Sequence, residues 1–121
     1  MTPKKPVLLI IDDEPLICEI LKDIVMSLTQ RLEIVTTTQV REALKLIPSA
    51  DLIISDIQMP DQHLLDQALK KVMSEKPIAR MSGVTRGRTN FMIEKPFRAE
   101  QIAETLQLLY SFHRMKDVEA A

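Results

Sequence analysis

Carboxylate side chains follow two apolar segments of the sequence, and they are the residues best suited to chemistry. Asp12 and Asp13 come directly after the apolar run 7–11, and Asp56 closes a second apolar segment, 51–56. Two adjacent carboxylates about 4 Å apart would repel each other by roughly 4 kcal/mol at an effective dielectric constant near 20, so a fold that places them together normally supplies a cation. Because these ligands are all oxygen atoms, we expect a hard cation such as Mg²⁺.

The segments around these acids alternate between strand and helix patterns. The unbroken aliphatic run 7–11 is typical of a strand buried on both faces in a parallel sheet. Further strands are expected at 32–38, 51–56, 77–82 and 91–94, and helices at 14–28, 39–47, 63–74 and 99–115. This alternation predicts an α/β protein with a doubly wound, five-stranded parallel sheet. The acids would then lie at the carboxyl ends of the strands, the edge at which open α/β sheets bind ligands.

Two of the expected helices carry apolar residues at helical spacing, which predicts the faces they pack against the sheet. In the first helix these are Leu16, Ile17, Ile20, Leu21, Ile24, Val25 and Leu28. In the third they are Leu64, Leu65, Ala68, Leu69 and Val72. Cys18 falls inside the first pattern, so we expect it to be a small core residue. The apolar pattern of the last helix fades after Met115, which predicts a core of about 6–115 and a short C-terminal tail.

Length and composition bound the class of protein. The 121 residues predict a single domain, 1–121, large enough to fold without a disulfide or a structural metal. With 45% hydrophobic residues, 27% charged residues and a net charge of -1, the chain reads as an ordinary soluble protein, with no reason to expect direct binding to nucleic acid or a membrane. No apolar run approaches the roughly 20 residues of a membrane-spanning helix. A single cysteine makes the cytoplasm the expected location.

Three motifs in this order resemble those of the receiver domain of two-component response regulators, whose fold is flavodoxin-like. They are Ile11-Asp12-Asp13-Glu14-Pro15, Ser55-Asp56-Ile57-Gln58-Met59-Pro60 and Lys95-Pro96-Phe97. The resemblance extends from Val7 to about His113. Each motif alone is weak, but the three together at successive strand ends are specific.

The resemblance implies a metal site. Asp13 and Asp56 match the carboxylate ligands of Mg²⁺, and Asp12 matches the acid that holds the ion through water. The backbone carbonyl of Gln58 matches a further ligand. On this basis Mg²⁺ is the expected cofactor.

The resemblance also implies that Asp56 is the phosphoryl acceptor. Ser82 matches the hydroxyl group that bonds the phosphoryl group, and Lys95 matches the ammonium group that neutralises it. These residue types suit the chemistry, because a carboxylate is a competent nucleophile and phosphoryl transfer needs positioning and positive charge. The implied donor is a histidine kinase, a phosphotransfer protein or a small phosphodonor, and the implied output is altered binding to a downstream protein target. Such a domain is not a separate enzyme, although it could catalyse its own dephosphorylation.

The sequence departs from the family pattern between the fourth and fifth strands. Only residues 83–90, eight in number, separate Ser82 from Phe91. A parallel crossover that includes a helix needs at least about 10–12 residues. We therefore expect the family's fourth helix to be missing or reduced to a loop, and phosphorylation to order this segment. Met92 also stands where the family usually has an aromatic residue.

Other functions fit the sequence less well. A receiver-like module that binds proteins without being phosphorylated is favoured by the missing helix and opposed by the complete set of acid, hydroxyl and amine residues. An aspartate-nucleophile phosphatase would require a second acid two residues after the nucleophile, where Gln58 stands. A nucleotide-binding protein would require a glycine-rich phosphate loop, which the sequence lacks.

Overall fold

The computed structural model describes residues 5–82, 91–94 and 97–120, and the side chains of 5–81 and 97–114. In chain order the elements are β1 (Val7–Ile11), α1 (Pro15–Leu28), β2 (Glu33–Thr37), α2 (Val40–Leu46), a short 3-10 helix (Ile47–Ser49), β3 (Leu52–Asp56), α3 (Gln62–Val72), β4 (Ile78–Ser82), β5 (Phe91–Glu94) and α4 (Ala99–Ala120).

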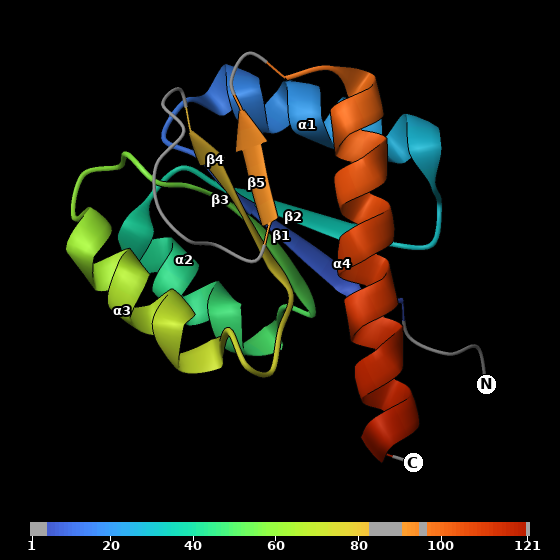
Figure 1. Ribbon diagram of the computed structural model, residues 1–121. Helices are drawn as coiled ribbons and strands as arrows, with labels where there is room; N and C mark the ends of the chain where they lie inside the picture. The colour runs from blue at the N-terminus through green and yellow to red at the C-terminus, as the bar shows by residue number, and fades with distance from the viewer. Residues whose placement is uncertain (1–4, 83–90, 95–96, 121) are drawn as a thin grey trace.

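The described strands form a parallel sheet in the order β2-β1-β3-β4-β5, with helices on both of its faces (Figure 1). β1 is a central strand: Leu8 pairs with Ile34 of β2 on one side and with Leu52 of β3 on the other. Apolar β-branched and aliphatic residues dominate these central strands because both faces of the sheet are covered. The predicted α/β class with a doubly wound parallel sheet is confirmed.

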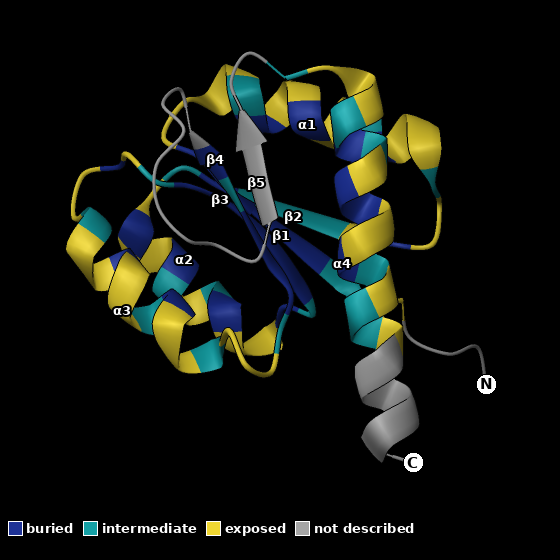
Figure 2. Ribbon diagram, in the orientation of Figure 1, coloured by how far each residue is buried: buried dark blue, intermediate teal, exposed yellow. Residues whose placement is uncertain are grey.

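β1 contributes its side chains alternately to two separate core layers. Leu8 and Ile10 pack in the layer beneath α1 and α4, whereas Leu9 and Ile11 pack in the layer beneath α2 and α3. All four are almost completely buried, and the dark blue centre of the sheet in Figure 2 shows this burial. A strand with this double role must be apolar at every position, which explains the unbroken run in the sequence.

The apolar face that we expected for α1 included residues that are exposed in the structure. The buried residues of α1 are Cys18, Leu21 and Val25, so the expectation that Cys18 belongs to the core is confirmed. Leu16 and Ile20, in contrast, are 65% and 39% exposed. At 3.6 residues per turn, these two residues lie two positions from Cys18 and therefore on the far side of the helix.

The ends of several elements also differ from expectation. α4 continues to Ala120, where we expected it to end near Met115 and to be followed by a tail. The physical reason is that residues 116–120 contain no glycine or proline to stop a helix and end in alanine, the best helix former. α2 ends at Leu46, one residue before the expected end, and Pro48 lies within the 3-10 helix that follows it. The expectation that the fourth helix of the family is missing concerns residues 83–90, which lie outside the described residues, and it stays a prediction.

The two leucines at the start of α3 test the orientation of that helix. Leu65 is fully buried, whereas Leu64 is 38% exposed, contrary to our expectation that both face inward. Leu65→Ala is expected to lower the free energy of unfolding by about 2–5 kcal/mol, because it removes buried methyl groups and leaves a cavity. Leu64→Ala, its matched control, is expected to cost less than about 1 kcal/mol. Urea denaturation of both variants measures the difference, and equal losses would contradict this orientation of α3.

Candidate functional site

Asp12 and Asp13 occupy the turn between β1 and α1. The Asp12 backbone N–H donates to the carbonyl oxygen of Thr37 (3.2 Å), which extends the pairing of β1 with β2 by one residue. Asp12 Oδ1 in turn accepts a hydrogen bond from the backbone N–H of Glu14 (2.9 Å). This side-chain-to-backbone bond closes the turn that leads into α1 at Pro15. Asp12 is fully buried, whereas Asp13 is exposed.

Asp56 is the last residue of β3 and is 4% exposed. Its Oδ1 accepts hydrogen bonds from the backbone N–H groups of Ile57 (2.8 Å) and Gln58 (3.4 Å). β1 and β3 are parallel neighbours, and Ile11 pairs with Ser55. The next residues in this register are Asp12 and Asp56, so parallel pairing alone brings the two acids to the same level at the sheet edge.

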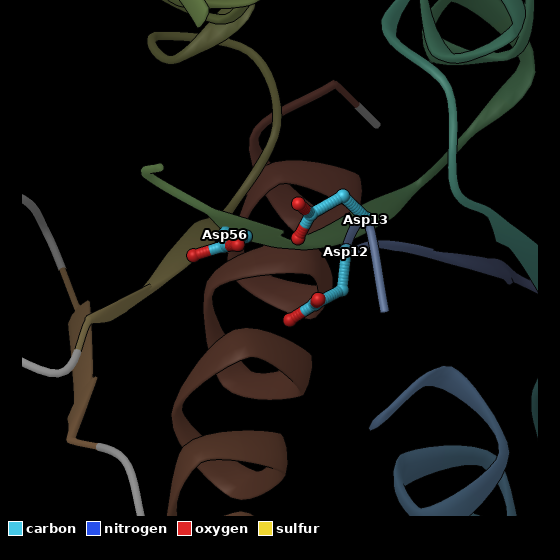
Figure 3. Close-up of side chains that lie close together, drawn as sticks. All are labelled: Asp12, Asp13 and Asp56. Atoms are coloured by element: carbon cyan, nitrogen blue, oxygen red, sulfur yellow. The ribbon is translucent and has the colours of Figure 1, made fainter. Parts of the chain in front are cut away.

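The three acids form one cluster. Each of Asp12, Asp13 and Asp56 offers a carboxylate oxygen, and these oxygens all lie within 4.8 Å of one another. Figure 3 shows the side chains gathered at the ends of β1 and β3. The predicted meeting of three acids from two separated segments is therefore seen in the structure.

The electrostatics of this cluster favour a cation. The pKa of the Asp13 carboxyl group is raised above its usual value, first because the fold partly removes it from water and then because the charges of Asp12 and Asp56 lie nearby. Nearby negative charges raise the pKa of a carboxyl group because they disfavour its charged form. The contribution of Asp12 and Asp56 therefore indicates an excess of negative charge at this site. Three hard oxygen donors in this arrangement fit Mg²⁺, which typically takes one or two protein carboxylates together with water.

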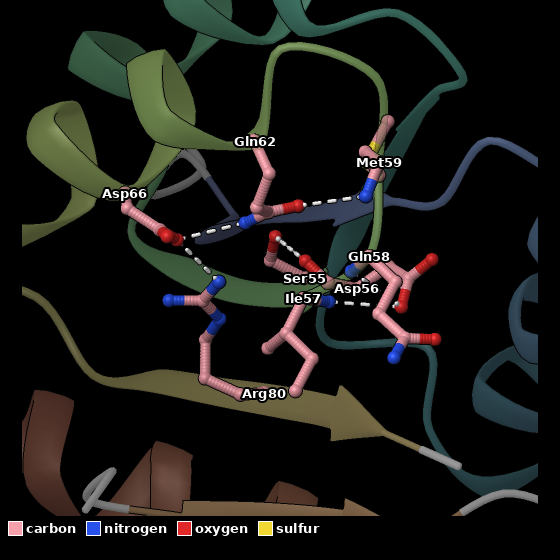
Figure 4. Close-up of polar contacts among 8 residues, drawn as sticks. All are labelled: Ser55, Asp56, Ile57, Gln58, Met59, Gln62, Asp66 and Arg80. Atoms are coloured by element: carbon pink, nitrogen blue, oxygen red, sulfur yellow. Dashed lines mark hydrogen bonds and ion pairs between the residues drawn. The ribbon is translucent and has the colours of Figure 1, made fainter. Parts of the chain in front are cut away.

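The loop between β3 and α3 completes the surroundings of Asp56 (Figure 4). The Gln62 side chain accepts a hydrogen bond from the Met59 backbone N–H at Oε1 (2.9 Å) and donates one from Nε2 to Asp66 Oδ1 (2.7 Å). Arg80 Nη2 donates to the same Asp66 oxygen (2.7 Å). Asp61, just before α3, has a φ of 61°, in the left-handed region that few non-glycine residues adopt.

The remaining predicted site residues stand as follows. Gln58 is the second residue after β3 and is exposed. Ser82 ends β4, which is the neighbour of β3 in the sheet, but its side chain lies outside the described residues, as does Lys95. Their assigned roles stay predictions.

Sequence reasoning missed the hydrogen-bonded set Gln62, Asp66 and Arg80. One signal was present in the sequence of the fourth strand. Arg80 and Ile78 lie two residues apart and therefore on the same face of the strand. Ile78 packs in the core, so a charged residue at position 80 is unexpected. A second signal was the spacing of Gln62 and Asp66, which are neighbours at i and i+4 on a helix. Their connection to β4 depends on how α3 packs, which the pattern does not specify.

The fold and the acid cluster together define an α/β protein with three carboxylates, placed so that they could hold a metal ion, at the carboxyl edge of its sheet. Residues 8–107 match the family model of the response regulator receiver domain. The chain therefore belongs to the response regulator receiver domain family.

Solved structures with the same fold were also found. Chemotaxis protein CheY4 of Vibrio cholerae has a TM-score of 0.73 at 23% identity, with 88% of this chain and 99% of that chain covered. The signal receiver domain of an HD domain-containing protein from Pseudomonas fluorescens has a TM-score of 0.78 at 17% identity, with 93% and 99% covered. The response regulator PhyR of Brucella abortus has a TM-score of 0.79 at 24% identity, with 97% of this chain but 52% of that chain covered. At these identities the likeness shows the fold alone.

A search of curated protein sequences found no match. Among the described residues, no helix is both long enough and apolar enough to cross a membrane.

The charge cluster predicts how Asp13→Asn changes stability in the absence of divalent cations. A carboxyl group whose pKa is raised by folding contributes stability below its unfolded pKa and loses it as the pH rises through the folded pKa. Removing this charge is therefore expected to stabilise the cation-free protein at pH 7 by a few tenths to about 1 kcal/mol, a small value because Asp13 is exposed. The gain should vanish near pH 3.

Thermal unfolding in EDTA at several pH values measures this difference. Asp23→Asn, which removes an exposed carboxylate from α1, is the matched control and should show no such gain. A destabilised Asp13→Asn protein at pH 7 would contradict the repulsion on which the cluster's cation preference rests.

Proposed function

We propose that this receiver domain accepts a phosphoryl group on Asp56 in a Mg²⁺-dependent reaction. The single observation that carries the proposal is that Asp56 ends β3 with its carboxylate in one cluster with those of Asp12 and Asp13. The donor is the phosphohistidine of a histidine kinase or a phosphotransfer protein, or a small phosphodonor. The domain would act in the cytoplasm, where such donors are found.

Asp56 is the nucleophile of the proposed reaction. One of its carboxylate oxygens attacks the phosphorus atom, and a P–O bond forms while the P–N bond to the histidine breaks. The imidazole nitrogen leaves with the electron pair and is then protonated. The N–H groups of Ile57 and Gln58 that bond Asp56 Oδ1 restrict rotation of the carboxylate, so part of the orientational cost is met before the donor arrives.

The carboxylates of Asp12, Asp13 and Asp56 and the backbone carbonyl of Gln58 are the groups that would hold Mg²⁺. When bound, Mg²⁺ would offset negative charge on the acids and on the phosphoryl oxygens, which is the main requirement of this kind of transfer. The Ser82 hydroxyl group and the Lys95 amine are proposed to contact the phosphoryl oxygens, as the family resemblance implies.

The acyl phosphate on Asp56 would be the signalling state. Attack of a water molecule on its phosphorus atom releases inorganic phosphate and restores the carboxylate, so the protein resets itself and has no separate substrate. The signal would leave through altered binding of a downstream protein target. Binding without phosphorylation, as a receiver-like adaptor, is the alternative outcome of the test below.

Uptake of beryllofluoride, a phosphoryl mimic, tests the proposal directly. The wild-type protein is expected to bind it only in the presence of Mg²⁺, and Asp56→Asn is expected to abolish binding because the nucleophilic oxygen is lost. Fluorine NMR measures the bound species. Asp23→Asn is the matched control and should behave as the wild type does. If the wild-type protein with Mg²⁺ takes up no beryllofluoride and no label from acetyl phosphate, the domain is an adaptor and the proposal is wrong.

A further inference from the structure

Four residues form a continuous chain of hydrogen bonds from the loop after Asp56 to the neighbouring strand β4 (Figure 4). The chain begins at the Met59 backbone N–H, passes through the Gln62 amide to Asp66 Oδ1, and ends at Arg80 Nη2. Gln62 also donates its own backbone N–H to the Met59 carbonyl oxygen (3.0 Å). Met59 is therefore bonded to Gln62 through both of its backbone polar groups.

Arg80 contributes little to the stability of the fold. Its side chain is only 12% exposed, and among the described residues its Nε is buried without a hydrogen-bond partner. A buried donor left unpaired costs about 1–3 kcal/mol. Its ion-pair partner Asp66 is 52% exposed, and an ion pair with one solvated member contributes about 1 kcal/mol or less. An apolar residue at this strand position would serve the core at least as well.

The position of Arg80 links it to the acid cluster. Arg80 pairs with Ser55, the residue before Asp56, in the sheet register. Ser55 Oγ donates to the Asp56 carbonyl oxygen (3.0 Å), and the Ile57 N–H donates both to the Met81 carbonyl oxygen (3.2 Å) and to Asp56 Oδ1. The start of the loop is thus fixed by β4 and by Asp56, and its end is fixed by Gln62.

Gln58 lies between these two fixed points. The backbone groups of residue 58 can move only as far as the bonds at 57 and 59 allow, so the hydrogen-bond chain restricts the backbone that would offer the Gln58 carbonyl to a cation. Holding a ligand in place before the ion arrives reduces the entropy lost on binding, which is the usual effect of groups that support metal ligands.

We propose that Gln62, Asp66 and Arg80 are positioning residues that set the Mg²⁺ affinity of the site by holding the loop 57–59. This inference rests on the proposed function, because it assumes that the cluster binds Mg²⁺. This role explains why a charged side chain stands at a strand position where its Nε is buried without a hydrogen-bond partner among the described residues.

The test compares Mg²⁺ affinity with stability in the same variants. Arg80→Met and Gln62→Leu each break the chain and keep similar side-chain volume. Both are expected to weaken Mg²⁺ binding by about tenfold, the lower end of the effect of groups that support metal ligands. Arg80→Met should unfold at the same urea concentration as the wild type or a higher one, because it removes the unpaired Nε donor and leaves Asp66, which is 52% exposed, in contact with water. NMR titration with MgCl₂ measures affinity, and urea denaturation measures stability.

Three further variants test whether the loss of affinity comes from breaking the chain of hydrogen bonds. Arg80→Lys keeps a cation that can pair with Asp66, so it is expected to lose less than about threefold in affinity. The double variant Arg80→Met/Gln62→Leu should bind Mg²⁺ no more weakly than the single variant with the lower affinity. Both substitutions break the same chain of hydrogen bonds, so their effects should not add. Arg41→Met, which removes an exposed arginine from α2, is the matched control and should leave affinity unchanged.

The outcomes separate this inference from the function on which it rests. If the wild-type protein shows no saturable Mg²⁺ binding, the proposed function fails. If it binds Mg²⁺ and Arg80→Met and Gln62→Leu bind within twofold of it, the function stands and the positioning role is wrong. A loss of stability with unchanged affinity would likewise assign the chain of hydrogen bonds to the fold alone.

Discussion

Repulsion among three carboxylates is the constraint on which the arrangement of this receiver domain depends. Asp12 and Asp56 are buried, and with Asp13 their oxygens lie within 4.8 Å of one another. Charges at this separation oppose folding unless an ion neutralises them. The fold tolerates them because the parallel pairing of β1 with β3 is secured by two core layers, one on each face of the sheet. The apolar interior thus supplies the stability that offsets the repulsion among the acids.

The same acids organise the backbone around them. Asp12 closes the turn into α1 by accepting the Glu14 N–H, and Asp56 accepts the N–H groups of the two residues that follow it. These bonds help to satisfy backbone donors at the sheet edge. They also fix how each carboxylate points. The site is therefore arranged by its own protein groups, and a cation or a phosphoryl donor would meet a geometry that already exists.

The acid cluster could be predicted from the sequence because parallel strands end at a common edge, so an acid that follows each apolar run must meet the others. The polar chain from Gln62 to Arg80 could not, because Arg80 and Asp66 are 14 residues apart and meet only through the packing of α3 on the sheet. Hydrophobicity likewise could not show that Leu65 is buried and Leu64 exposed, because both residues are leucine. Their side chains differ only in the direction in which they leave the helix. The end of α4 was missed because a fading apolar pattern does not stop a helix.

β1 contributes side chains to both halves of the interior, with Leu8 and Ile10 on one side and Leu9 and Ile11 on the other. β1 is therefore one of the strands through which a disturbance in either half, whether from a substitution under α1 or a shift of α3, reaches the opposite half. Asp12 and Asp13 are attached to its end. A partner that displaced β1 from either side of the sheet would therefore also displace these acids.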